Sequence, residues 1–512
     1  MVPARTFRLN LPAPGLARRT LLGASLALPA FIRHARATDV PRFALGVASG
    51  HPRPDTVVLW TRLTGDDLPA RVPVQWELAH DEGFAQIAAR GTEEADAAWA
   101  HSVHAEPAGL DPGRWYWYRF TALGQASRSG RTRTAPAPDA QATLRLAIAS
   151  CQRWDHGHWA AWRHTAQQGL DLVAFLGDYL YEYPSPPTAP RLHKGGLLRS
   201  LDQYRARYAQ YKGDPALQDA HAACPWVLVP DDHEVENDYA GTLPTTPLGA
   251  DMGVLRAAAW QAFWEHQPLP RSMRPRGADM PLFGHLDWGR LARIHLLDTR
   301  QHRDGQACPP WPRRSGSRTV AAADCPALAD PARSLLGPAQ ERWLAEGWRL
   351  DRPWNLLAQQ TLMARATSGP ERRTWTDGWD GYPAARRRLL ASVAERRVPG
   401  VVVLGGDVHA HVVATLKADP DDPRAPVLAS EFCGTSISSH GRPQRAWDAA
   451  RAVNPHLLHA RSDQRGCTLF DIDGQRLQAR LLAVDDPLDP ASAVHEQARF
   501  VVEAGQPGPQ RA

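Results

Sequence analysis

After residue 140 the chain carries six short, continuous apolar segments, and longer segments separate each one from the next. The six are residues 144–149, 171–176, 226–229, 292–297, 355–358 and 401–404. Such segments are typical of strands that are buried on both faces of a parallel sheet. Amphipathic patterns that predict helices lie between them, at residues 201–211, 339–350 and 384–397. The sequence therefore predicts an α/β fold in which helices connect parallel strands.

Residues 43–133 show a different pattern, in which short runs of branched and aromatic residues alternate with turns. A turn at residues 110–113 leads into a tyrosine-bearing strand, as at the corner of fibronectin-like sandwiches. A proline-rich linker follows at residues 135–139. We expect a small β-sandwich whose role is either packing or substrate binding, and packing against the second domain is favoured. Residues 467–484 return to an alternating pattern and predict antiparallel strands.

The first 37 residues have the layout of a signal peptide. Arg18 and Arg19 directly precede a short apolar run, and the segment ends in Ala-Arg-Ala at residues 35–37. Paired arginines before a short apolar region indicate export by the twin-arginine pathway, and a Sec signal that contains two arginines is the alternative. We therefore expect a periplasmic or secreted protein.

Overall charge gives no indication of nucleic-acid binding. The net charge is +5, but the first 37 residues hold six arginines and no acidic residue, so the rest of the chain carries −1. The remaining arginines are scattered, and no electrostatic footprint for nucleic acid is present. No stretch approaches the roughly 20 apolar residues of a transmembrane helix, so we expect no transmembrane segment.

Six cysteines fit an oxidising compartment without forming a disulfide framework. Cys308 and Cys325 flank a polar, proline-rich insertion and would either close it by a disulfide or remain separate thiols. The cysteines at 224, 433 and 467 are either buried thiols or paired among themselves.

The residues that follow the predicted strands carry the groups suited to chemistry. Carboxylate, imidazole or thiol groups follow the predicted strands at Cys151, at Asp178, in residues 231–237 and in residues 407–411, and Asp298 and Arg300 follow the remaining strand. A single aspartate at such a place often caps a helix. Several at successive strand ends would crowd negative charge unless cations neutralise it, and ligands bind at these ends of open α/β sheets. The pattern therefore favours a metal cluster.

The same residues resemble a known family. Gly177-Asp178, Asp-His-Glu at 232–234 and Gly-Asp-Val-His at 406–409 are similar to blocks of the calcineurin-like metallophosphoesterases. The fuller strings at 177–183, 231–239, 297–300 and 379–383 look like one branch, the alkaline phosphatase D (PhoD) family. The likeness runs from about Phe43 to the C-terminal tail and includes Gly-Val-Ala-Ser-Gly at 46–50.

The resemblance implies a fold and a domain plan. The expected fold is the α/β metallophosphoesterase αββα sandwich, two mixed β-sheets flanked by helices, preceded by a small fibronectin- or Ig-like β-sandwich. The expected domains are residues 1–37 as twin-arginine signal peptide, residues 38–136 as the N-terminal β-sandwich and residues 140–512 as the metallophosphoesterase catalytic domain.

The resemblance also implies a mixed metal site of Fe3+ and Ca2+ and its ligands: Cys151, Asp178, Tyr181, Asp232, Asn237, Asp407 and His409. Asp178 would bridge the metals. Cys151, Tyr181 and His409 would complete the iron site, since thiolate and phenolate are anionic donors suited to a trivalent ion. The others would bind calcium, which prefers oxygen ligands.

Several of these assignments have structural alternatives. Asp232 stands where the wider superfamily has a ligand asparagine, and Asp231, Asp232 and Asn237 compete for the same contacts. Cys151 would otherwise be a small buried hydrophobic residue, and Tyr181 would otherwise serve aromatic packing.

His233 and Arg300 are the candidate catalytic residues. His233 would stabilise charge that develops on the substrate phosphoryl group, or would only donate a hydrogen bond within its loop. Arg300 would clamp a phosphate oxygen, or would form a structural ion pair. The block at residues 379–383 is expected to shape the pocket wall.

The expected function is that of an exported alkaline phosphatase and phosphodiesterase. It would hydrolyse phosphate mono- and diesters by attack of a metal-activated oxygen, in the service of phosphate scavenging. The alternative is phospholipase D-like cleavage of phospholipids, and a remote alternative is a secreted binding protein without activity. The expected partners are phosphate-ester small molecules and the twin-arginine export machinery, with no stable nucleic-acid binding.

Overall fold

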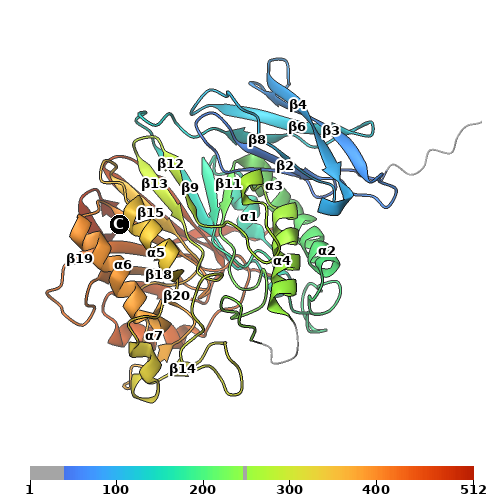
Figure 1. The fold of residues 1–512 in the computed structure, drawn as a ribbon. Helices are drawn as coiled ribbons and strands as arrows, with labels where there is room; N and C mark the ends of the chain where they lie inside the picture. The colour runs from blue at the N-terminus through green and yellow to red at the C-terminus, as the bar shows by residue number, and fades with distance from the viewer. Residues whose placement is uncertain (1–39, 246–250) are drawn as a thin grey trace, which may run out of the picture. The chain divides into compact units, whose positions relative to one another are not determined.

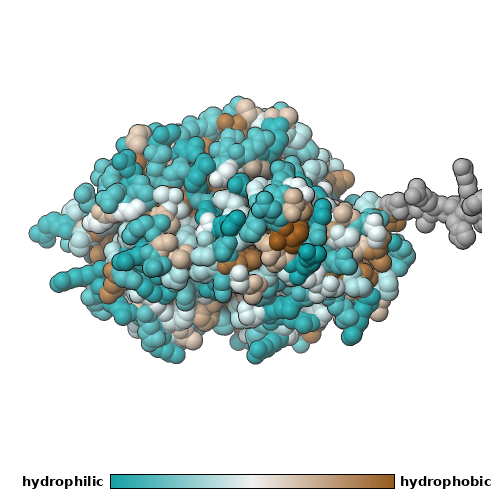
Figure 2. Space-filling model, turned by 90° about the horizontal axis from the view of Figure 1, so that it is seen from above, coloured by the Kyte–Doolittle hydropathy of each residue, from teal (hydrophilic) through white to brown (hydrophobic). Residues whose placement is uncertain are grey.

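The computed structural model describes residues 40–245 and 251–512, and Figure 1 shows the fold as a ribbon. The predicted signal peptide, residues 1–37, lies outside these described ranges. Within them, none of the helices has the length and apolar character required to cross a bilayer. The molecular face in Figure 2 is mostly hydrophilic, and hydrophobic residues occur there in small scattered groups.

A ten-stranded mixed sheet forms one layer of the fold. Its strand order is β24-β23-β22-β21-β9-β10-β11-β1-β2-β5. Strands β9, β10, β11 and β1 are parallel, and β21 joins β9 in the antiparallel sense. The strand bounds, in chain order, are β1 Val47–Gly50, β2 Val58–Arg62, β5 Ser102–Ala105, β9 Leu144–Ala149, β10 Leu172–Phe175, β11 Trp226–Leu228, β21 Gly466–Ile472, β22 Arg476–Val484, β23 Val494–Glu503 and β24 Gln506–Arg511.

A seven-stranded mixed sheet forms the second layer. Its order is β12-β13-β15-β17-β19-β18-β20, with β13, β15, β17 and β19 parallel. The bounds are β12 Gly284–Trp288, β13 Ala292–Leu296, β15 Trp354–Ala358, β17 Val401–Gly405, β18 His411–Lys417, β19 Val427–Cys433 and β20 Leu457–Arg461. A short pair of strands, β14 (Thr319–Val320) and β16 (Thr374–Trp375), lies apart from both sheets.

The two sheets pack face to face and share one apolar core. Side chains alternate along each strand, so Leu146 and Ile148 of β9 meet Leu356 of β15 and Leu404 of β17 in that core. All four are fully buried. Strands buried on both faces explain why the sequence shows continuous apolar segments rather than an alternating pattern.

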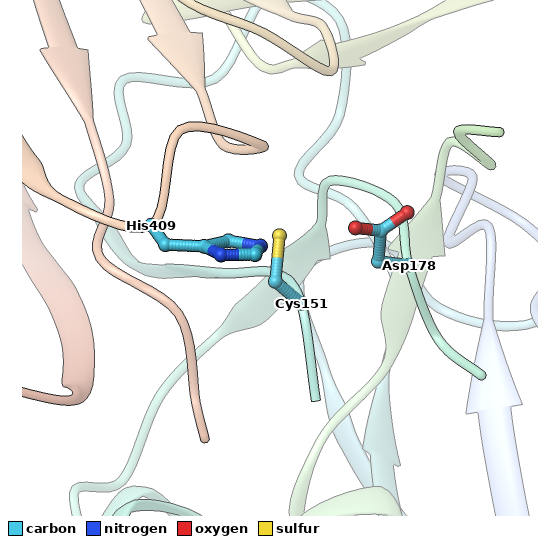
Figure 3. Close-up of side chains that lie close together, drawn as sticks. All are labelled: Cys151, Asp178 and His409. Carbon is cyan, nitrogen blue, oxygen red and sulfur yellow. The ribbon is translucent and has the colours of Figure 1, made fainter. Parts of the chain in front are cut away.

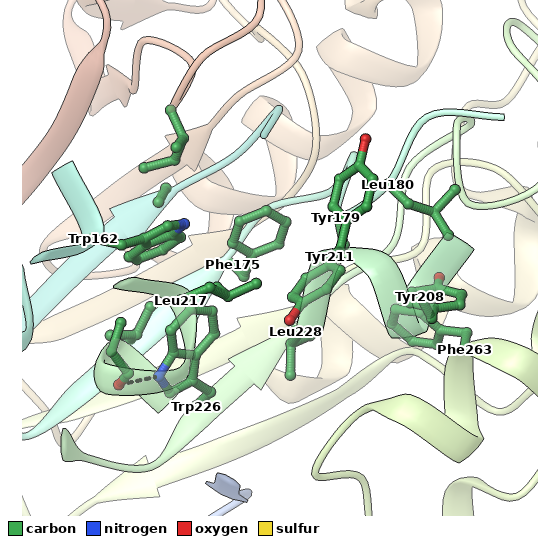
Figure 4. Packing of buried hydrophobic residues seen from close by; sticks show 14 of the residues in the cluster. Trp162, Phe175, Tyr179, Leu180, Tyr208, Tyr211, Leu217, Trp226, Leu228 and Phe263 are labelled. Atoms are coloured by element: carbon green, nitrogen blue, oxygen red, sulfur yellow. Dashed lines mark hydrogen bonds between the residues drawn. The ribbon is translucent and has the colours of Figure 1, made fainter. Parts of the chain in front are cut away.

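Helices cover the outer faces of both sheets. An aromatic cluster, which Figure 4 shows in part, joins the ten-stranded sheet to its helices. In it Trp226 of β11 donates from Nε1 to the carbonyl of Ala220 at 3.2 Å. The helices on this side are α1 Ala160–Ala166, α2 Leu201–Lys212, α3 Pro215–Ala223 and α4 Met252–His266, and those on the other are α5 Gly337–Gly347, α6 Pro383–Arg396 and α7 Gln444–Val453. The predicted αββα sandwich of two mixed sheets is confirmed.

The N-terminal β region is also present. A sheet of β3 (Arg71–Ala79), β4 (Ile87–Asp96), β6 (Trp115–Ala122), β7 (Gln125–Ala126) and β8 (Gly130–Arg133) shares an apolar core with β1, β2 and β5. The predicted tyrosine corner forms, since the backbone N–H of Asp111 donates to the hydroxyl of Tyr116 at 2.9 Å. Because β1 pairs with β11, one layer of this sandwich continues the ten-stranded sheet.

Contacts of the N-terminal region match the packing role. Trp60 of β2 donates from Nε1 to the carbonyl of Glu265, and His104 Nδ1 lies 2.8 Å from the carbonyl oxygen of Leu269. Both side chains are buried. The domain bounds of 38–136 and 140–512 stay a prediction.

The predicted elements after residue 140 agree closely with the structure. All six strands lie within one residue of their predicted ends. Helix α6 ends where Arg397 adopts a left-handed conformation with φ 52°, and α5 ends three residues earlier than predicted, at Gly347. The disulfide between Cys308 and Cys325 forms, and the other four cysteines are free, buried thiols.

Candidate metal centre

The candidate metal ligands lie where strands β9, β10 and β17 end. Cys151 follows β9 and Asp178 follows β10, while Asp407 and His409 follow β17 of the other sheet. All four have a left-handed backbone, with φ values of 58°, 59°, 64° and 52°. Residues other than glycine seldom adopt this conformation, and it concentrates at functional sites. The site therefore forms where the strand ends of the two sheets meet.

Close approach of the loops requires glycine at two positions. A Cβ atom on Gly177 would lie 2.5 Å from Cβ of Asp231, and one on Gly406 would lie 2.5 Å from Oγ of Ser150. Any side chain there would push apart the loops that carry Asp178 and Asp407. This packing explains the Gly-Asp pairs at 177–178 and 406–407.

One group of side chains combines thiol, carboxylate and imidazole. Ligand atoms of Cys151, Asp178 and His409 all lie within 4.8 Å of one another, and Figure 3 shows the three side chains gathered together. The hydroxyl of Tyr181 lies 2.9 Å from Asp178 Oδ2 and 3.3 Å from His409 Nε2. Cys151, Asp178 and Tyr181 are at most 2% exposed. All four predicted iron ligands therefore converge.

Electrostatics of this group fit a bound cation. Burial, together with neighbouring negative groups, raises the pKa values of Cys151, Asp178 and Tyr181 well above their usual range. Asp178 Oδ1 is buried and has no hydrogen-bond partner among the described residues. Burial lowers the pKa of His409 to about 3, so its imidazole is neutral and can donate a lone pair. A cation would satisfy all four donors at once.

A second group consists of Asp178, Asp232 and His233, whose ligand atoms also lie within 4.8 Å of one another. His233 Nδ1 lies 2.7 Å from Glu182 Oε2, and its ring packs on that of Tyr181 with centroids 4.1 Å apart. Burial would lower the pKa of His233, but the carboxylates of Glu182, Asp178 and Asp232 raise it well above its usual value. Asp178 belongs to the first and the second group, which is the position expected of a bridging ligand, and Asp232 links the second group to a third that contains Asp238 and Asp377.

Asp407 and Asn237 occupy less defined positions. Thr361 donates from Oγ1 to Asp407 Oδ2, and burial together with Asp231 and Asp377 raises the pKa of Asp407 well above its usual range. Asn237 is partly buried, and its backbone N–H donates to Glu182 at 2.9 Å. Asp407 belongs to none of the candidate groups of histidine, cysteine and acidic residues among the described residues. The role of Asp407 and Asn237 as ligands stays a prediction.

Arg300 is buried among carboxylates. Its side chain is 2% exposed, and Nη1 and Nη2 contact the two oxygens of Asp377 at 3.1 and 2.9 Å. Its Nε donates to Asp231, and Nη2 lies 3.6 Å from Asp232. These contacts fit the structural ion pair, and the phosphate clamp stays a prediction.

Glu234 and Ser439 are functional candidates that the sequence reasoning missed. The Glu234 carboxylate is fully buried and accepts backbone N–H groups of Asp178 and Asp231, so it joins the ends of β10 and β11. Glu234 could have been selected from the sequence, because it is the last residue of the Asp-His-Glu block at 232–234. Ser439 donates from Oγ to the Tyr181 hydroxyl at 2.7 Å. Ser439 follows β19, and nothing in its local sequence marks it.

Comparison with known proteins identifies the family. The PhoD-like phosphatase model matches residues 146–481, and the model of the PhoD-like phosphatase N-terminal domain matches residues 28–136. The chain belongs to the PhoD-like phosphatase family. Alkaline phosphatase D of Bacillus subtilis (strain 168) is 41% identical over 485 residues, which cover 91% of this chain and 82% of that protein.

Solved structures agree with this assignment. A PhoD structure superposes with a TM-score of 0.86 at 38% identity and covers 93% of each chain. A purple acid phosphatase from yellow lupin seeds shares the fold, with a TM-score of 0.54 at 13% identity over 90% of this chain and 73% of that one. This PhoD-like chain is a phosphoester hydrolase, and its candidate site has the donors of a metal-dependent enzyme.

Proposed function

We propose that this chain is an exported, metal-dependent phosphoesterase that hydrolyses phosphate monoesters and diesters. The observation that carries the proposal is the convergence of Cys151, Asp178 and His409 on one point, with the Tyr181 hydroxyl beside them. Metal ions held there would supply Lewis-acid chemistry to the phosphoryl oxygens and would activate an oxygen nucleophile.

The family resemblance implies two kinds of metal ion, and the donor chemistry is consistent with both. Cys151, Tyr181 and His409 would hold Fe3+ together with Asp178, because two of these donors become anionic on binding. Asp232, Asn237 and Asp407 would hold Ca2+, because they offer only oxygen donors. Asp178 would bridge the ions, which its membership of the first and the second side-chain group supports.

His233 would stabilise the transition state. Glu182 lies 2.7 Å from its Nδ1 and orients the ring. The ring would donate from Nε2 to an oxygen of the phosphoryl or leaving group, where negative charge develops. Arg300 would support the site without touching the substrate, since its ion pairs hold Asp231 and Asp377 in place.

Export is supported by two independent features. Residues 17–22 read Ala-Arg-Arg-Thr-Leu-Leu before an apolar run, which is the pattern recognised by the twin-arginine machinery. The Cys308–Cys325 disulfide is consistent with an oxidising compartment. Outside the cytoplasm, hydrolysis of diverse esters would release phosphate for uptake, which is a scavenging role.

The test is nitrophenol release from p-nitrophenyl phosphate and bis(p-nitrophenyl) phosphate by the purified, folded protein. We expect both substrates to react and both rates to fall to background after chelation. Asp178→Ala should lose activity and metal together, while Asp66→Ala, at an exposed aspartate, should retain both. An inert protein, or activity that survives complete metal removal, would contradict the proposal. Faster cleavage of phospholipids than of either nitrophenyl ester would favour the phospholipase D-like alternative.

A further inference from the structure

A cavity of about 370 Å³ adjoins the candidate metal centre. Asp407 and His409 line it, together with Val408 between them. An ester whose phosphoryl group lies at the metal centre can therefore place its organic group in this cavity. The expectation that residues 379–383 shape a pocket wall is borne out for Trp379 and Asp380, which both line the cavity.

Indole rings supply much of the cavity lining. Trp375 of β16, Trp379 and Trp447 of α7 come from three separate elements, and all three line the same space. Trp379 and Trp447 are almost fully buried, whereas Trp375 is partly exposed. Smaller apolar residues fill the gaps between them: Leu362, Ala364, Ala366 and Val408. Of the three, Trp375 has the most exposed surface, and a flat ring can stack offset or edge-on against it.

Charged groups at the cavity favour a neutral ring over a cation. The Asp380 carboxylate is already paired, since Arg386 contacts Oδ1 at 2.7 Å and the N–H of Ala366 donates to Oδ2 at 2.9 Å. The exposed Arg442 guanidinium lines the cavity and lies 5.5 Å from the ring centroid of Trp375. Its positive charge would repel an ammonium group.

We propose that this cavity binds an aromatic ring of the substrate, so that the preferred substrates are phosphate esters with a flat aryl or heteroaryl group. The proposal rests on the proposed function, because the phosphoryl group must lie at the metal centre. It adds a specificity role for the tryptophans of the cavity, which are not among the expected metal ligands.

The experiment compares inhibitors that cannot be hydrolysed, so that differences in leaving-group reactivity play no part. Inhibition constants are measured for phenylphosphonate, methylphosphonate, 2-aminoethylphosphonate and inorganic phosphate against p-nitrophenyl phosphate. We expect phenylphosphonate to bind about tenfold more tightly than methylphosphonate, as expected for stacking on aromatic walls. The aminoethyl compound should bind no more tightly than the methyl compound.

Two variants locate the effect. Trp375→Ala should reduce the phenyl-to-methyl preference to about twofold or less while inorganic phosphate still inhibits, which shows that the metal centre is intact. Trp311→Ala, at a tryptophan that is 92% exposed outside the cavity, should leave the preference unchanged.

The outcomes separate the two claims. A wild-type preference near one, a preference for the aminoethyl compound, or a preference that Trp375→Ala leaves intact would overturn this inference. Because the wild-type preference needs no variant, it decides the matter even if Trp375→Ala fails to fold. A protein that does not hydrolyse p-nitrophenyl phosphate at all would instead overturn the proposed function.

Discussion

Replacing Arg300 by alanine should destabilise the fold before it affects phosphate binding. The guanidinium is 2% exposed and holds Asp231 and Asp377, which come from separate loops beside the metal centre. Without it, Asp377 would still pair with Arg303, whose Nη1 lies 3.2 Å from Asp377 Oδ1. Asp231 would lose its cation, and its Oδ2 already has no hydrogen-bond partner among the described residues.

The expected magnitude follows from that difference. Breaking a buried ion pair by removal of one partner costs roughly 3–5 kcal/mol, because it leaves an uncompensated buried charge. Since only one of the two main carboxylates is left unpaired, we expect the lower end, about 3 kcal/mol of unfolding free energy. Arg293 offers a matched control in strand β13: it contacts both oxygens of Asp287, whose side chain is 32% exposed. Arg293→Ala should cost less than Arg300→Ala, because Asp287 is partly exposed and keeps a second arginine, Arg352, at 3.8 Å.

The assay is urea unfolding, followed by tryptophan fluorescence, in parallel with steady-state kinetics on p-nitrophenyl phosphate. The ion-pair account predicts a markedly lower urea midpoint for Arg300→Ala and a smaller decrease for Arg293→Ala. If Arg300→Ala instead kept the wild-type midpoint and only raised KM and the inhibition constant of phosphate, the reasoning would be wrong and Arg300 would be a phosphate clamp.

Three further expectations concern other parts of the molecule. Replacing both Cys308 and Cys325 by alanine should lower the stability of that loop by about 3 kcal/mol, given the 17-residue separation. A protease should then cleave the loop faster, and chemical reduction of the wild type should accelerate cleavage to a similar extent. Cleavage rates that neither the double variant nor the reduced wild type changes would refute this. Lys212 is buried, and burial lowers its pKa in the folded protein. The unfolded chain binds the proton more readily, with a lysine pKa near 10.4, so the wild type loses stability as the pH falls below that value. Lys212→Met should therefore raise the urea midpoint at pH 7 and progressively less towards pH 10, and a constant gain would show that charge is not the cause. Tyr181→Phe should remove any visible absorption that arises from phenolate bound to iron, and an unchanged spectrum would show that Tyr181 serves packing alone.

Much of the fold could be predicted because burial on both faces leaves a direct mark on sequence. Segments such as residues 226–229 and 401–404 are continuous apolar runs, and they form β11 and β17 with almost the same bounds. The N-terminal strands were harder to place, because nothing local indicates that Gly50 of β1 pairs with Trp226 of β11. Pairing between distant segments depends on tertiary packing rather than on the residues of either strand.

The candidate site was predictable to the extent that its residues stand at strand ends. Cys151, Asp178 and His409 were selected for that reason, and they do converge. Residues that act through others carried no such signal: Asp377 contacts Arg300 from a segment 77 positions away. Arg300 is also buried by several loops that are distant in sequence, and the sequence of any one of them does not predict this burial.

Elemental analysis of the folded protein, paired with its hydrolysis rate, tests the central claim most directly. Bound metal should be present in stoichiometric amount, should be removed by chelation together with p-nitrophenyl phosphate hydrolysis, and should restore the rate when added back. Full activity from a protein that contains no metal would contradict the account.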